Sequence, residues 1–244
     1  MNRRLRSRLL VVVTAGTIGV LSPVWGPVAL RNVPIFGVED VRVRGAHFVP
    51  AEQIRALAAF GPEASVWDDM RPIENRLAEH PLLLEASVRR AGIHRVDVVI
   101  REVQPVAFVS TPELVPVDAA GRALALDPAG SALDLPILVG ADVTDGRVEP
   151  EAARLALEVL DQVSALDSAF TRRISEIRPL RGTSVEFLLL PGSPLDRVVL
   201  PIRDAAAAFL RVGSAVSLAE ARGPVREADA RYENEVVIRM GRSQ

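Results

Sequence analysis

The chain opens with a sharp change from charged to apolar residues. Four arginines occupy the first eight positions, namely Arg3, Arg4, Arg6 and Arg8. From Leu9 to Leu30 no charged side chain occurs, and at about 1.5 Å per residue this segment reaches about 33 Å, enough to cross a hydrocarbon core of about 30 Å. The pattern predicts a transmembrane helix over 9–30. Because cytoplasmic flanks are enriched in arginine, residues 1–8 are predicted to be a cytoplasmic stub, and the bulk of the chain is predicted to lie outside the cytoplasm.

A cleaved signal peptide is the alternative interpretation of this segment. A charged start and an apolar stretch are common to both, and the paired arginines are also typical of twin-arginine export signals. Against cleavage, the best site, after Ala29, has Pro27 at position minus three. Pro23 and Trp25 suit the outer interface of a retained helix. Either outcome places the main body outside the cytoplasm.

After a short connector, alternating and helical patterns follow one another in the order strand, helix, helix, strand, strand. The predicted elements are a strand over Val38–Arg44, helices beginning near Pro50 and near Asp68, and strands over Leu83–Arg90 and Arg95–Val103. Gly45 ends the first strand. Asp68 or Asp69 is expected to cap the second helix, and Pro81 to stop it.

The remaining chain is richer in strands. Short strands are predicted over Phe108–Ser110, Leu114–Asp118, Arg122–Asp127, Ile174–Pro179, Ser184–Leu190 and Arg197–Ile202. Leu155, Val159, Leu160, Val163 and Leu166 recur at helical spacing and predict one amphipathic helix over Glu151–Leu166. Asp204 is expected to cap a last helix that runs to about Ala221.

The C-terminus predicts two more strands around a turn at Glu233-Asn234. In the last strand, over 235–240, Val236, Ile238 and Met240 would point into the core. Glu235, Val237 and Arg239 would then point to the opposite side, because successive side chains of a strand alternate.

Composition indicates a globular body rather than a tail or a nucleic-acid-binding protein, because about half the residues are apolar and the formal net charge is only -2. No cysteine is present, and the three histidines, His47, His80 and His94, lack the spacing of a zinc site. No catalytic sequence motif occurs. Asp68-Asp69, and Asp118 with Asp127, are better explained by capping and turns than by acid–base catalysis. The sequence predicts no enzyme activity, no metal and no cofactor.

The predicted order of elements and several short motifs resemble the FtsQ/DivIB family of bacterial division proteins. The motifs are VEDVRVRG (38–45), AEQI (51–54), IENRLAEHP (73–81), ASVRR (86–90), VVIREVQPVA (98–107), LPILVG (135–140) and DARY (229–232). The resemblance implies an α+β chain: a single N-terminal transmembrane helix, a POTRA domain of order β-α-α-β-β over 36–104, and an FtsQ-type, β-rich domain with two helices over 105–241. LPILVG would lead into the first of those helices.

The resemblance also implies a non-catalytic scaffold in the inner (plasma) membrane. Such a scaffold binds FtsB/FtsL-type bitopic division proteins and helps to control the septal wall synthase. A partner strand would add to a sheet edge at the C-terminal end. The partner contacts implied are Tyr232, Val237, Arg239 and Arg181.

Other interpretations stay open at this point. Tyr232 also suits a packed core aromatic, Val237 a half-buried strand residue and Arg239 a solvated charge. For the whole protein, the main alternative is a membrane-anchored periplasmic POTRA adaptor for another envelope assembly or secretion complex. An unrecognised hydrolase, and a chaperone module in front of an outer-membrane barrel, fit less well, because a barrel needs many strands of about ten residues.

Overall fold

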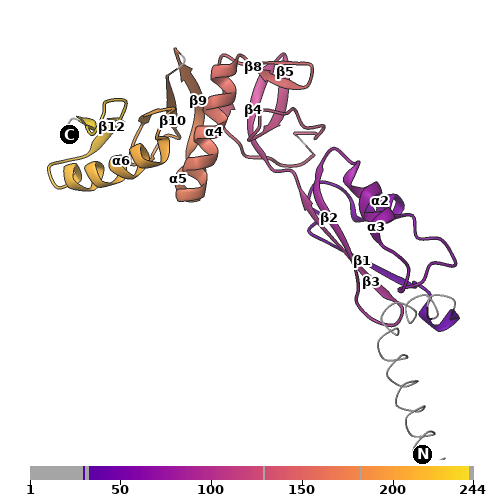
Figure 1. The fold of residues 1–244 in the computed structure, drawn as a ribbon. Helices are drawn as coiled ribbons and strands as arrows, with labels where there is room; N and C mark the ends of the chain where they lie inside the picture. The colour runs from indigo at the N-terminus through magenta and orange to yellow at the C-terminus, as the bar shows by residue number, and fades with distance from the viewer. Residues whose placement is uncertain (1–29, 31–32, 129, 182, 242–244) are drawn as a thin grey trace, which may run out of the picture. The chain divides into compact units, whose positions relative to one another are not determined.

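A computed structural model describes residues 30, 33–128, 130–181 and 183–241. The chain divides into two compact units between Val103 and Gln104 (Figure 1). The predicted transmembrane segment and the stub before it lie outside the described residues, apart from Leu30. Of the helices in the described ranges, none combines the length and apolar character needed to cross a membrane.

The first unit is a small sheet with two helices on one face. Its elements are η1 (Pro34–Phe36), β1 (Asp40–Arg44), α2 (Ala51–Ala58), α3 (Arg71–Ala78), β2 (Leu83–Arg90) and β3 (Arg95–Glu102). The strand order is β1-β3-β2, in which β1 runs parallel to β3 and β2 runs antiparallel to it. Val96 and Val98 of β3 are fully buried, as are Ile54 of α2 and Leu77 of α3. The period-2 and helical patterns therefore meet in one core, as the sequence predicts.

The start of α3 differs from the prediction. The residue that precedes the helix is Met70, and no side chain caps it. Asp68 instead accepts a hydrogen bond from the Ser65 N–H, at 2.8 Å, and Asp69 accepts one from the Arg71 N–H, at 3.1 Å. Both carboxylates thus stabilise the loop before the helix, so the predicted cap at Asp68 or Asp69 is wrong.

The second unit is built on a mixed sheet of eight strands, in the order β13-β12-β11-β10-β9-β6-β4-β5. These strands are β4 (Pro105–Thr111), β5 (Glu113–Asp118), β6 (Ile137–Leu138), β9 (Ile174–Leu180), β10 (Ser184–Leu189), β11 (Arg197–Pro201), β12 (Val225–Asp229) and β13 (Val237–Met240). A two-stranded hairpin, β7 (Asp142–Thr144) and β8 (Arg147–Glu149), lies outside the sheet.

Helices α4 (Glu151–Leu166) and α6 (Ala205–Glu220) pack on one face of this sheet, and the short α5 (Ser168–Thr171) follows α4 (Figure 1). The bounds of α4 agree with the prediction. Its buried face includes Leu157, Leu160 and Val163, whereas Leu166, which was expected on that face, is 45% exposed. Phe187 of β10 and Phe170 of α5 meet in the same core, with ring centroids 6.5 Å apart.

Two predictions between β5 and α4 are wrong. Residues 122–127 form no strand, because the Asp118 carboxylate accepts hydrogen bonds from the Ala120 and Arg122 N–H groups and turns the chain there. The segment 135–140 does not lead directly into a helix either, because the β7–β8 hairpin intervenes. Asp145 and Gly146, both with positive φ, form the tip of that hairpin, as an Asp-Gly turn requires.

Candidate interaction edge

Strand β13 ends the eight-stranded sheet and is paired on one side only, with β12. The pairing is antiparallel, with Glu227 opposite Arg239 and Asp229 opposite Val237. Among the described residues no strand covers the other side of β13. A strand end of this kind presents unpaired N–H and C=O groups, to which an extended segment of another chain can add.

The side chains of β13 alternate between the two faces of the sheet. Val236, just before the strand, and Ile238 pack against the core. Val237 and Arg239 point to the face opposite the helices, where the side chain of Arg239 is 72% exposed and Val237 is 52% exposed. Met240 departs from the prediction that it is buried, because it is 39% exposed at the end of the strand. The edge therefore carries one apolar and one cationic side chain on the same face.

Arg239 belongs to a row of alternating charges that crosses this face from β9 to β13. The ion pairs in order are Glu176–Arg178 at 2.5 Å, Arg178–Glu186 at 3.9 Å, Glu186–Arg197 at 2.6 Å, Arg197–Glu227 at 3.6 Å and Glu227–Arg239 at 3.1 Å. The last pair, Glu227–Arg239, is exposed on its arginine side and adds little stability. It places the charge of Arg239 beside Glu227 at the edge.

The segment after β12 is fixed by one carboxylate. Arg231 donates to both oxygens of Asp229, at 3.0 Å from Nε to Oδ1 and 2.6 Å from a terminal nitrogen to Oδ2. Desolvation by burial, the largest single influence, raises the pKa of Asp229, but the hydrogen bonds and charge of Arg231 outweigh it and leave that pKa below its usual value. This bidentate pair turns the chain so that Tyr232, the next residue, is 51% exposed. Tyr232 is thus not a core aromatic.

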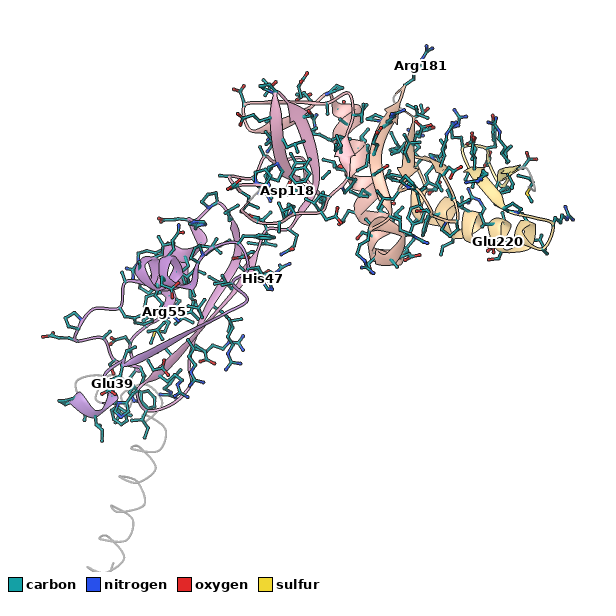
Figure 2. All side chains as sticks on the ribbon, turned by 180° about the vertical axis from the view of Figure 1, so that it is seen from behind. Glu39, His47, Arg55, Asp118, Arg181 and Glu220 are labelled. Carbon is teal, nitrogen blue, oxygen red and sulfur yellow. The ribbon has the colours of Figure 1, made fainter. Side chains whose placement is uncertain are left out.

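Arg181 and Tyr232 lie together although they are far apart in the sequence. Both line a groove of about 550 Å³, which is bounded by the ends of β9, β10 and β11 and by the segment after β12. Arg181 sits in the β9–β10 loop with a left-handed backbone, φ 37°, and points outward (Figure 2). No ion pair joins Arg181 to another residue within the described ranges. The groove therefore brings a cation and an aromatic ring together at the ends of β9, β10 and β11.

The first unit matches a known protein family. Residues 36–102 match the family model described as "POTRA domain, FtsQ-type". A protein described as cell division protein FtsQ, from Myxococcus fulvus, is 31% identical over 185 residues, which are 72% of this chain and 65% of that protein. The first unit is thus a POTRA domain of the FtsQ type, and the chain is similar to FtsQ. The chain spans 65% of the length of this FtsQ relative, which is less than two thirds.

One solved structure of the FtsQ/DivIB family is also similar. It is the major extracytoplasmic domain of the trans isomer of the cell division protein DivIB from Geobacillus stearothermophilus. The match covers 49% of this chain and 96% of that domain, with 23% identity and a TM-score of 0.31.

A second groove beside the same edge was not predicted from the sequence. It has a volume of about 400 Å³ and lies on the helix side of the sheet, between the end of α6 and β13, where Leu218, Ile238 and Met240 line it. Leu218 is 74% exposed. The sequence does hold a signal for this groove, because two leucines of α6, Leu210 and Leu218, lie outside the apolar stripe that faces the core. This groove therefore flanks the β13 edge on the helix side of the sheet.

No group of three or more metal-binding side chains comes together within the described ranges. The carboxylates that the sequence singled out have structural partners. Asp118 accepts from two backbone N–H groups and pairs with Arg122 at 2.7 Å, which is the turn chemistry expected for it.

Proposed function

We propose that this chain is a non-catalytic, single-pass membrane scaffold of the bacterial divisome. In this proposal residues 9–30 anchor it in the inner (plasma) membrane with the N-terminus in the cytoplasm, and the domains over 36–104 and 105–241 lie outside. It binds FtsB/FtsL-type bitopic division proteins and links them to the septal wall synthase. The FtsQ-type POTRA domain, the similarity to FtsQ and the uncharged segment 9–30 support the proposal.

The observation on which the binding mode depends is the open side of β13 at the end of the sheet. A partner strand that adds there gains backbone hydrogen bonds, and alternate side chains give the choice of partner. Val237 would contact an apolar side chain of the added strand and Arg239 an acidic one. Tyr232 and Arg181 would take the next side chains in their groove, where the unpaired guanidinium of Arg181 suits a carboxylate.

The test uses the tagged full-length protein, crosslinked in membranes before solubilisation, with captured proteins identified by mass spectrometry. The double substitution Val237→Ala with Arg239→Ala removes both outward side chains of β13. Captured bitopic division proteins are expected to be lost from this variant, while its melting temperature stays unchanged because both side chains are exposed.

The opposite end of the same sheet provides the matched control. Leu114 of β5 is 44% exposed at the other edge strand, so Leu114→Ala should leave capture unchanged. Unfolding of the double variant, or equal loss of capture with Leu114→Ala, would argue against binding at β13. Recovery of barrel-assembly or secretion components from the native protein would favour the periplasmic adaptor instead.

A further inference from the structure

The first unit exposes apolar side chains at the end where the described chain begins. Val33 and Ile35 lie at η1, and Ile93 lies in the loop that joins β2 to β3; they are 39%, 57% and 57% exposed. A single exposed aliphatic side chain needs no explanation. Here, however, two separate segments, η1 and the β2–β3 loop, bring such side chains to the same end of the unit.

Ring contacts and backbone hydrogen bonds join those segments. Trp67 packs edge-on against Phe36 of η1, with centroids 5.9 Å apart, and Arg90, the last residue of β2, lies 3.5 Å over the ring of Trp67. The carbonyl of His94, next to Ile93, accepts the N–H groups of Glu39 and Asp40 at 2.9 and 3.1 Å. Figure 2 shows Glu39 at the extremity of this unit. Ile35 and Ile93 are therefore carried by one rigid end of the first unit.

The connection to the predicted transmembrane segment is short. Ile35 is five residues beyond Leu30, and five residues span at most about 18 Å when fully extended. The headgroup layer on each side of the hydrocarbon core is itself about 5–8 Å thick. A membrane anchor that ends at Leu30 thus holds Ile35, and with it the rigid end that carries Ile93, at or close to the headgroup layer.

The charges of this end are compatible with such a position. Asp40 pairs with Arg95 at 2.6 Å and with Arg42 at 3.3 Å, and the Arg95 hydrogen bond holds the pKa of Asp40 below its usual value. Glu39 lies 3.8 Å from the His94 ring. The guanidinium of Arg90 lies over Trp67 at the same end, and a cation there suits lipid phosphate.

We propose that the end of the POTRA-type unit formed by η1 and the β2–β3 loop sits in the phospholipid headgroup layer, with Ile93 and Ile35 as the immersed side chains. This inference rests on the membrane anchor of the proposed function. It adds a second point of contact with the bilayer, which restricts how the first unit tilts relative to the membrane. The occupant of this apolar end is lipid rather than another protein.

The absence of cysteine from the chain makes a direct test possible. The full-length protein carrying Ile93→Cys is labelled with the environment-sensitive fluorophore NBD and reconstituted in phospholipid vesicles that contain lipids with nitroxide in the headgroup. The expected result is a blue-shifted emission that these lipids quench. The matched control is Leu84→Cys, an equally aliphatic position, 48% exposed, at the other end of β2 and about 20 Å further along the strand. That label should stay in water and remain unquenched.

Three outcomes would overturn the inference in distinguishable ways. An unquenched label at 93, in protein that resists carbonate extraction, would mean that the anchor exists but the loop stays clear of the lipid. Equal quenching at 84 and 93 would mean that the whole unit lies along the membrane. Release of the protein by carbonate would contradict the anchor itself, and with it the proposed localisation. Thermal unfolding of each labelled variant checks that neither cysteine disturbs the fold.

Discussion

At the scale of single residues, the chain uses carboxylates as acceptors for backbone and arginine donors. Asp229 and Arg231 are one example, because their bidentate pair sets the direction of the segment that leads to Tyr232. The DARY motif therefore has a structural explanation: its aspartate holds the arginine, its alanine is buried, and its tyrosine is left exposed.

The Asp229 pair predicts a pH dependence of stability. Because the pKa of Asp229 is lower in the folded chain than the usual value of about 3.9, the unfolded state takes up the proton first as the pH falls. The stabilisation is therefore fully present above about pH 5, where the unfolded carboxyl is ionised, and is lost as the pH drops through the folded pKa. Thermal unfolding of the native chain and of Asp229→Asn is followed from about pH 6 downward. The native chain should have the higher melting temperature near pH 6, and the difference between the two melting temperatures should narrow in acid.

The partner residue supplies the check on this assignment. Arg231→Ala removes the donor that lowers the pKa of Asp229, so it should flatten the acid part of the plot of melting temperature against pH. Adding Asp229→Asn to this variant should change its melting temperature little further. If the melting temperatures of the native chain and of Asp229→Asn differ by the same amount down to low pH, the Asp229–Arg231 pair does not stabilise the folded state.

At the scale of elements, the periodic segments were predictable and the local hydrogen bonds were not. The bounds of α4 and β2 follow from hydrophobic spacing alone, since each element buries one face. The caps of α3 and α6 did not follow, because an aspartate before a helix has several competing backbone donors. Asp204 does precede α6, but its left-handed backbone, φ 56°, leaves its side chain without a capping hydrogen bond.

The candidate interaction edge was likewise predictable in part. The last strand and its alternation could be predicted, and so could the turn before it. The proximity of Arg181 to Tyr232, and the row of charges that ends at Arg239, depend on the order of strands in the sheet. Nothing in the local sequence encodes that order, because β11 and β12 are parallel neighbours joined through α6.

The end of β1 offers a prediction at the element scale. Gly45 has φ +85°, and a Cβ there would lie 2.2 Å from the carbonyl oxygen of Ile100 in β3. Gly45→Ala should therefore destabilise the first unit by about 2 kcal/mol or more, through backbone strain and through separation of β1 from β3. Unfolding followed by Trp67 fluorescence, in a Trp25→Phe background, measures this. Gly61→Ala, where a Cβ meets nothing within 4 Å, should change stability by no more than about 0.5 kcal/mol, and an equal loss at both glycines would contradict the steric explanation.

At the scale of the whole molecule, the division between Val103 and Gln104 suggests two units that unfold separately. The chain has no cysteine, so each unit is stabilised without disulfides. Glu102, at the end of the first unit, is only 2% exposed and accepts hydrogen bonds from three successive backbone N–H groups, those of His47, Phe48 and Val49, each at 2.9 Å. This glutamate therefore secures the loop before α2 to the end of β3.

Glu102→Gln separates the two units in a single experiment. The amide keeps the size of the side chain but loses the charge and one acceptor, so the first unit should lose about 3 kcal/mol, which for a unit of this size lowers its melting temperature by more than about 10 °C. Trp25 and Trp67 are the only tryptophans, so in a Trp25→Phe background fluorescence reports the first unit alone. Far-UV circular dichroism follows mainly α4 and α6 of the second unit, whose transition should stay in place. A shift of both signals together would mean that the chain unfolds as one cooperative body, and that the boundary at Val103 does not separate folding units.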